Sequence, residues 1–167
     1  MPFNGSRRGA MPTKPEICPR NLLETSKVMS IAVGGDGQTW SAPVYYLFSE
    51  GRFYFFSNPR ARHIQMAKNS TSAASIFRDD IDFKNLEGIQ MSGTIQKSPK
   101  DICSLAVAKR YCSRFKIIAP PKSISDISDI LDFFASKFHA ALYYFEPESV
   151  YYMDNRRGFG SREKIKL

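Results

Sequence analysis

A junction between an aromatic run and a basic run holds the residues best suited to chemistry, in FYFFSNPRARHIQMAKN (Phe53–Asn69). Asn58 or Ser57 can cap a helix there, because short polar side chains accept hydrogen bonds from the free N–H groups at a helix start. Pro59 suits the first helical position, since proline has a helical φ and lacks only an N–H that would be unpaired there. The stretch therefore predicts a strand that runs directly into a short helix, from about Pro59 to Asn69.

Three cationic side chains fall in the first turn of this predicted helix: Arg60, Arg62 and His63. The positive end of a helix dipole attracts anions and disfavours cations, so these side chains are explained if a phosphate binds beside them. Arg62 can hold a phosphate through two parallel hydrogen bonds, and Ser57 can add a hydroxyl. The spacing alone leaves a second interpretation open, namely solvated charges on the surface of a basic protein.

The sequence shows no nucleophile with a neighbouring base and no metal-binding motif. The two histidines, His63 and His139, are far apart in sequence, and neither a Gly-x-Ser-x-Gly motif nor a Cys-x-x-Cys pair occurs. We therefore expect no metal site. If the protein is an enzyme, the reactive chemistry should belong to a cofactor that the protein binds and orients.

The elements that position the junction are mostly short strands. Residues 27–58 predict three strands separated by two tight turns, GGDGQ and SEGR, which supply the glycines and acidic residues that such reversals need. In TWSAPVYYLF, alternate side chains should share one face of the strand: Trp40, Ala42, Val44, Tyr46 and Phe48. Trp40, the only tryptophan, is expected to pack in the core beside the first turn.

The remaining segments predict further strands and a few helices. A short helix is expected over Asn21–Ser26, one strand each over 70–80 and 85–98, and two aromatic-rich strands over 139–155. SPKDICSLAVAKRYCSRF predicts a helix capped by Ser98, with Pro99 at its first position and Asp101 completing a capping box. A second, amphipathic helix carries an apolar stripe: Ile127, Ile130, Leu131, Phe134 and Phe138. This order favours a mainly β fold, a small β-barrel with peripheral helices, over a doubly wound sheet.

Composition limits the class of protein and its partners. The 167 residues fit one folded domain, 17–167, after a stretch rich in Pro, Gly and basic residues, 1–16, that we expect to be a flexible arm. The apolar runs are too short to span a membrane, and the first residues lack the apolar segment of a secretory signal, so we expect a cytoplasmic protein. The net charge of +8 favours an anionic partner, which charge alone leaves open between nucleic acid, a membrane surface and a phosphorylated small molecule.

Several short motifs occur in an order that resembles a known family. TWSAPVYYLF precedes RFYFFSNPRARH and GIQMSGTIQ, a helix ends in RYCSRF, and DNRRGFG follows near the end of the chain. This order, from about Leu22 to Lys164, resembles the flavin-binding split-barrel proteins related to pyridoxamine 5′-phosphate oxidase. The match is with a poorly characterised bacterial branch that ends in D-N-x-x-G-F-G. The chain departs from the oxidase itself, which has Ser-Arg-Lys where Ala-Arg-His stands here.

The resemblance implies a split β-barrel of the FMN-binding type, with FMN bound non-covalently at the interface of a homodimer. The phosphate would meet residues of the junction: Ser57, Asn58, Arg62 and His63. The isoalloxazine edge would lie along the backbone of one strand segment: Pro43, Val44, Tyr45 and Tyr46. Further contacts would come from Gln90 and Ser92 on a neighbouring strand. Apart from the resemblance, the glycines on both sides of Phe159 fit either a loop that folds back with Phe159 near the ligand or a surface tail.

These observations together favour an FMN-dependent oxidoreductase that acts on a small molecule, with no catalytic residue assigned and no membrane partner. Two alternatives stay open. A basic nucleic-acid-binding barrel would stack bases on its aromatics, but its cations lie at both ends and in loops rather than among the strand aromatics, so nucleic acid is the weaker expectation. A flavin-binding protein that serves sensing, storage or haem-related chemistry would carry the same motifs.

Overall fold

The computed structural model describes residues 19–68, 70–117 and 127–167, so the expected arm over 1–16 lies outside the described residues. The strands, in chain order, are β1 (Val28–Gly35), β2 (Gln38–Tyr45), β3 (Leu47–Ser49), β4 (Arg52–Ser57), β5 (Ser72–Arg78), β6 (Glu87–Lys97), β7 (Ala141–Asp154) and β8 (Arg162–Ile165). The helices are α1 (Arg20–Thr25), α2 (Arg62–Met66), α3 (Ile102–Phe115) and α4 (Ile127–Phe138), with 3₁₀ turns η1 (Phe83–Asn85) and η3 (Asn155–Arg157).

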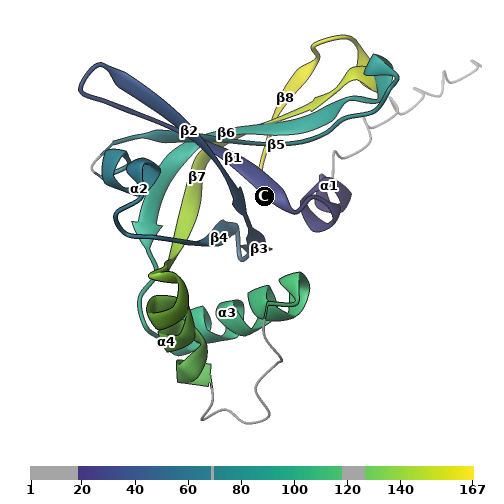
Figure 1. Cartoon of the computed structure of the whole chain (residues 1–167). Coiled ribbons are helices and arrows are strands. Elements are labelled where there is room, and N and C mark those ends of the chain that lie inside the picture. The colour runs from purple at the N-terminus through teal and green to yellow at the C-terminus, as the bar shows by residue number, and fades with distance from the viewer. Residues whose placement is uncertain (1–18, 69, 118–126) are drawn as a thin grey trace, which may run out of the picture.

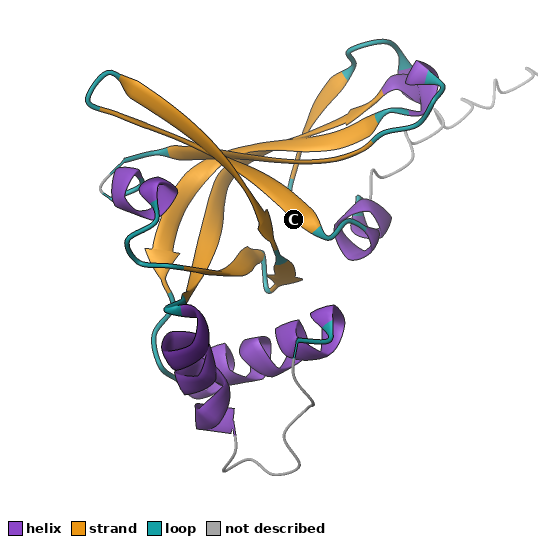
Figure 2. Cartoon of the chain, in the orientation of Figure 1, coloured by secondary structure: helices purple, strands orange, loops and turns teal. Residues whose placement is uncertain are grey.

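The strands form one antiparallel sheet that curls into a half-barrel (Figure 1). Its order is β2-β1-β5-β6-β7-β4-β3, and β8 pairs with the remaining part of β7. The two ends of this order, β2 and β3, are consecutive in the chain and are joined through Tyr46. Figure 2 shows the helices outside the sheet, with α3 and α4 side by side below it. The predicted mainly β barrel with peripheral helices is confirmed.

Two tight turns bring β1 against β2 and β3 against β4, as predicted. Asp36 and Gly37 have φ of 51° and 72°, and Glu50 and Gly51 have φ of 51° and 76°. Two consecutive positive φ values define the turn whose twist matches that of a β-hairpin, and Asp-Gly is a favoured pair for it. The prediction of three strands in this region is wrong, however, because the chain bends at Tyr46 and makes four. Tyr46 is fully buried, and its hydroxyl donates to the Leu23 carbonyl (2.9 Å).

Strand β4 is apolar on both faces because both faces are covered. Phe53 and Phe55 are fully buried in the barrel interior, while Tyr54 packs on the opposite side with residues of α3. Phe56, also on that side, stacks on Phe134 of α4 with ring centroids 3.6 Å apart. Each buried aromatic side chain contributes about 2–3 kcal/mol of hydrophobic stabilisation. The unbroken FYFF run is therefore the sequence signature of a strand between two layers.

Helix α3 begins three residues later than predicted. Its N-cap is Asp101, whose Oδ1 accepts a hydrogen bond from the Ser104 backbone N–H (2.8 Å). Ser98 is not the cap, because its own N–H donates to the Leu142 carbonyl (2.9 Å) and its Oγ is bonded to Ser104 Oγ (2.7 Å). Ser98 and Pro99 therefore belong to the connection from β6.

Helix α4 buries part of the predicted stripe. Ile130 and Phe134 are buried, whereas Phe138, at the end of the stripe, is 50% exposed. The side chain of Ile127 lies outside the described part. No helix within the described ranges has both the length and the apolar character needed to cross a membrane.

A single long strand, β7, replaces the two predicted closing strands. It pairs with β6 over most of its length, and the register shifts between Ser92 and Gly93, where Gly93 faces Pro147. Proline lacks the N–H that a regular ladder needs, and a bulge lets the strand pass it. Any Cβ at Gly93 would overlap the Glu146 carbonyl oxygen, so the close crossing requires glycine.

A buried carboxylate, Glu87, connects several strands at the end of the sheet that lies opposite α2. It pairs with Arg78 and with Arg156 (Nη2 to Oε2, 3.1 Å), and it accepts from the Tyr152 hydroxyl (2.7 Å). Burial, together with the neighbouring Glu87 carboxylate, raises the pKa of Tyr152 to about 12. The cluster joins β5, β6, β7 and η3.

Candidate functional site

The junction after β4 has a different local structure from the one predicted. Helix α2 begins at Arg62, and Ala61, in extended conformation at its N-cap, gives it no side-chain cap. Asn58 instead closes a turn, because its Oδ1 accepts from the Arg60 N–H (2.8 Å) and its carbonyl accepts from the Ala61 N–H (2.9 Å). Such a turn competes with the helix for the same N–H groups. The predicted helix start at Pro59 is therefore wrong, and the predicted end at residue 69 lies outside the described residues.

Ser57 and His63 form the buried part of the junction. Ser57 is 8% exposed at the end of β4, and its Oγ lies 2.8 Å from Nε2 of His63 in a hydrogen bond. Desolvation of the half-buried ring lowers the pKa of His63 below its ordinary value, which favours the neutral imidazole. A hydroxyl and a neutral imidazole can between them direct a donor toward an anion.

Arg62 supplies the exposed cation of the junction. Its guanidinium carbon lies 4.5 Å from the centroid of the Trp40 ring, and Nη2 donates to Gln38 Oε1 (2.7 Å). A guanidinium has five N–H donors, and this hydrogen bond uses one of them. Trp40 is 42% exposed, so its predicted core position is wrong; it serves instead as a stacking surface for Arg62.

The segment predicted to lie along a flavin ring is at the edge of the sheet order, where β2 pairs only with β1 along its length. By the alternation of an antiparallel ladder, the peptide groups of Tyr45 point away from β1, and the Tyr45 carbonyl accepts from the Tyr111 hydroxyl (3.1 Å). The side chains of Val44 and Tyr46 face the core, whereas Pro43 and Tyr45 are exposed. Tyr46 can therefore contact a ligand only through its backbone.

Gln90 and Ser92 lie on the outer face of the sheet, in two rows that cross the strands. One row joins Pro43, Ser30, Ser75, Gln90 and Tyr151. The next row joins Ser41, Ala32, Ala73, Ser92 and Ser149. Since neighbouring strands are spaced by about 4.8 Å, Gln90 lies roughly 14 Å from Pro43, on the same face of the sheet.

Phe159 is not brought to the junction within one chain. Its ring is 84% exposed and contacts Phe83 edge-on, with centroids 6.2 Å apart. Figure 1 shows α2 at one end of the sheet and the connection between β7 and β8 at the other. Arg157 in this connection pairs with Glu163 of β8 (3.4 Å), so the loop is held by its own charges.

The structure joins Ser57 to His63 and places the side chain of the adjacent Arg62 against two residues that sequence reasoning missed there, Gln38 and Trp40. The GGDGQTW turn was the available signal, since it places both residues at the tip of a hairpin. The turn does not indicate that this tip folds against α2. The described residues contain no group of three or more His, Cys, Asp or Glu side chains arranged to hold a metal ion.

Comparison with known proteins gives relatives of low identity and a shared fold. No protein-family model matches the chain. Over 143 residues it is 24% identical to the UPF0306 protein YhbP of Escherichia coli O157:H7, covering 84% of this chain and 85% of that protein. Among solved structures it is similar to the conserved hypothetical protein Rv2991 of Mycobacterium tuberculosis, with a TM-score of 0.65 and 13% identity over 88% of this chain and 89% of the other.

Two further solved structures resemble the chain and have named ligands. The heme binding protein of Mycobacterium smegmatis has a TM-score of 0.63 and 13% identity, covering 88% of this chain and 55% of that one. An FAD-binding protein of Mesorhizobium loti has a TM-score of 0.55 and 18% identity, covering 78% of this chain and 87% of that one. At these identities the likeness shows the fold, a split β-barrel, and the predicted fold class is confirmed.

Proposed function

We propose that the protein binds FMN at the Ser57–His63 junction, as a homodimer, and works as a flavin-dependent oxidoreductase on a small molecule. The observation that carries the proposal is the hydrogen-bonded Ser57–His63 pair at the end of an aromatic strand, next in sequence to the exposed Arg62 guanidinium. The FAD-binding relative of the same fold gives further support.

The junction fits a phosphate in its chemistry. The Arg62 guanidinium, held between Trp40 and Gln38, has N–H groups left for an anion, and a pre-oriented guanidinium loses little side-chain entropy on binding. The hydrogen-bonded Ser57–His63 pair can add one further donor, which suits a phosphate that accepts several hydrogen bonds. The exposed face of Trp40 provides an aromatic surface next to the same anion site.

The outer face of the sheet fits a second copy of the chain. From β2 to β7 its two central rows contain no charged residue, and Lys164 of β8 follows Tyr151 at the end of one row. Most of the side chains in the rows are small: Ser30, Ala32, Ser41, Ala73, Ser75, Ser92 and Ser149. Large exposed apolar side chains border or end these rows: Val28, Tyr45, Phe77 and Tyr151. Interface cores are depleted in charge and enriched in aromatics, as this face is. Association here would bring a partner's residues toward Gln90, Ser92 and Pro43, which one chain keeps apart.

A bound flavin would supply the redox chemistry, and the protein would supply binding and orientation. In this proposal Arg62, Ser57 and His63 hold the phosphate end, while the backbone of Pro43–Tyr46 at the sheet edge orients the ring. The second copy would exclude water from the outer face, where Gln90 and Ser92 offer polar contacts.

The test is to purify the protein, record its visible spectrum with and without added FMN, and measure its mass in solution. We expect the two absorbance bands of bound flavin, quenched FMN fluorescence and a dimer. A protein that takes up no FMN would refute the proposal. A single intense Soret band would instead favour haem binding, the function named for the relative from Mycobacterium smegmatis.

A further inference from the structure

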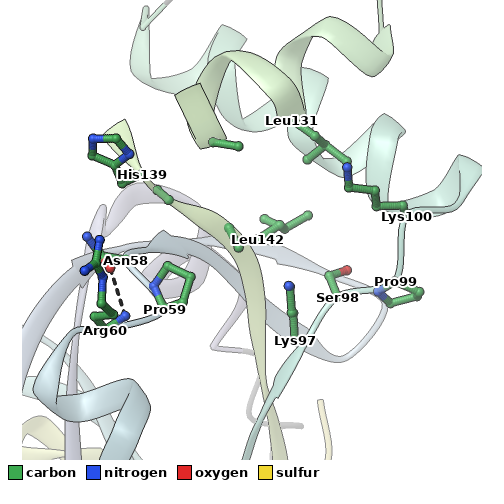
Figure 3. A pocket seen from close by; sticks show the side chains of 13 residues that line it. Asn58, Pro59, Arg60, Lys97, Ser98, Pro99, Lys100, Leu131, His139 and Leu142 are labelled. Carbon is green, nitrogen blue, oxygen red and sulfur yellow. Dashed lines mark hydrogen bonds between the residues drawn. The ribbon is translucent and has the colours of Figure 1, made fainter. Parts of the chain in front are cut away.

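A cationic cleft lies beside the junction, between α4 and the ends of β4, β6 and β7 (Figure 3). Its volume is about 400 Å³, which is within the range of roughly 300–1,000 Å³ typical of small-molecule sites. Four basic side chains line it, and none of its described lining residues is acidic: Arg60, Lys97, Lys100 and His139.

The basic residues come from three separate connections of the fold. Arg60 leaves the turn that Asn58 closes, Lys97 and Lys100 lie at the end of β6 and in the connection to α3, and His139 follows α4 with a positive φ of 50°. Figure 3 shows Arg60 and His139 at one end of the cleft, Lys100 at the other, and Lys97 projecting between them. The fold thus gathers charges that are distant in sequence.

Most of this charge has no protein partner among the described residues. Lys100 lies 3.5 Å from Asp132, in a pair that is largely exposed on both sides. The structure gives the Arg60 guanidinium and the Lys97 ammonium no described carboxylate. Like charges gathered in a cleft disfavour one another, and an anion that enters relieves this repulsion.

The wall between the charges is apolar. Pro59, Leu131 and Leu142 line it, and Leu142 lies between Arg60 and Lys100 in Figure 3. An inorganic anion would use the charges and leave this wall in water. A cationic rim over an apolar wall therefore matches a molecule with both an anionic group and an apolar body.

We propose that this cleft binds a small organic anion, with its charged group against Arg60 and Lys97 and its apolar part against Leu131 and Leu142. Asn58, one of the predicted phosphate contacts, also lines this cleft. The site differs from the proposed flavin site in its cation, because the turn at Asn58 directs Arg60 to the cleft while Arg62 stacks on Trp40. It does not require that flavin binds.

The test uses 8-anilinonaphthalene-1-sulfonate, an aromatic anion, and N-phenyl-1-naphthylamine, its uncharged counterpart, with the flavin-free protein. In leucine-methyl NMR spectra we expect the sulfonate to shift the resonances of Leu131 and Leu142. The double variant R60A/K97A should weaken its binding roughly tenfold to a hundredfold, the loss expected for charge-assisted contacts. The uncharged dye should bind both proteins equally.

Lys84→Ala is the matched control, since it removes an exposed lysine at the far end of the sheet. We expect it to change sulfonate binding by less than about twofold, the scale of a distant, screened charge. An equal loss in Lys84→Ala, or shifts confined to other leucines, would overturn the cleft assignment. If R60A/K97A instead lowers affinity for FMN, the cleft is part of the flavin site and the proposal of a separate site fails.

Discussion

Replacing Arg62 with alanine gives the sharpest test of the phosphate site. The Arg62 guanidinium makes one hydrogen bond to Gln38 and stacks on Trp40, both at the surface, so its loss should lower the free energy of unfolding by only about 1 kcal/mol. A phosphate contact through the same group is worth about 1.5–3 kcal/mol, which is roughly a tenfold to 150-fold change in affinity. The variant should therefore fold normally and bind FMN far more weakly.

The assay compares two flavins that differ only in the phosphate. Quenching of flavin fluorescence gives the dissociation constants of FMN and riboflavin for the wild type and for Arg62→Ala. We expect the loss with FMN alone, because riboflavin has no anion for Arg62 to bind. Arg60→Ala serves as the matched control, since it removes a neighbouring arginine that lines the cleft beside α4, and it should leave both constants within about twofold.

The reasoning fails if riboflavin loses as much affinity as FMN, because the effect would then come from the ring site or from a general disturbance. It fails equally if Arg62→Ala unfolds in urea at a much lower concentration than the wild type. Arg62 would in that case be a structural residue of the hairpin tip.

Three more predictions concern protonation, stability and assembly. Burial lowers the pKa of His63, and a phosphate beside it should raise that pKa again, so FMN affinity relative to riboflavin should rise as the pH falls from about 8 to 6. Calorimetry in two buffers should show proton uptake that His63→Gln loses; equal uptake by both proteins would contradict this. Glu87→Gln should lower the free energy of unfolding in urea by about 1.5–3 kcal/mol, since it weakens three contacts of a buried carboxylate. A loss below about 0.5 kcal/mol would show that these contacts contribute little to stability. Ser75→Glu should give a monomer in sedimentation, whereas Ser113→Glu on exposed α3 should stay dimeric; a dimeric Ser75→Glu would exclude the outer face as the interface.

The barrel could be predicted from sequence because its signals are local. A few neighbouring residues determine the Asp-Gly and Glu-Gly turns and the alternation in the early strands. The structure contains both turns and shows this alternation in β1. The errors occur where a distant contact decides. Strand β7 continues past Pro147 because Gly93 of another strand allows a bulge there.

The candidate site was predictable in part for the same reason. Ser57 and His63 are six residues apart, and the sequence showed both at one junction. Trp40 was misplaced because nothing in its own segment shows the guanidinium on which it stacks, 22 residues later. The start of α2 was misjudged because Asn58 can cap either a turn or a helix, and the packing of Ile64 and Ala67 in the core favours the later start.

Strand β7 also sets the order in which the protein can be assembled on the ribosome. It pairs with β6 over most of its length and with β4 through Ala141–Phe145, so β4 has only the three-residue β3 beside it until β7 has been made. During synthesis one edge of the aromatic FYFF strand therefore stays unpaired until a segment about 85 residues downstream has been made. Nascent chains that stop before Ala141 should be the ones that chaperones retain or that aggregate, and completion of β7 should release them.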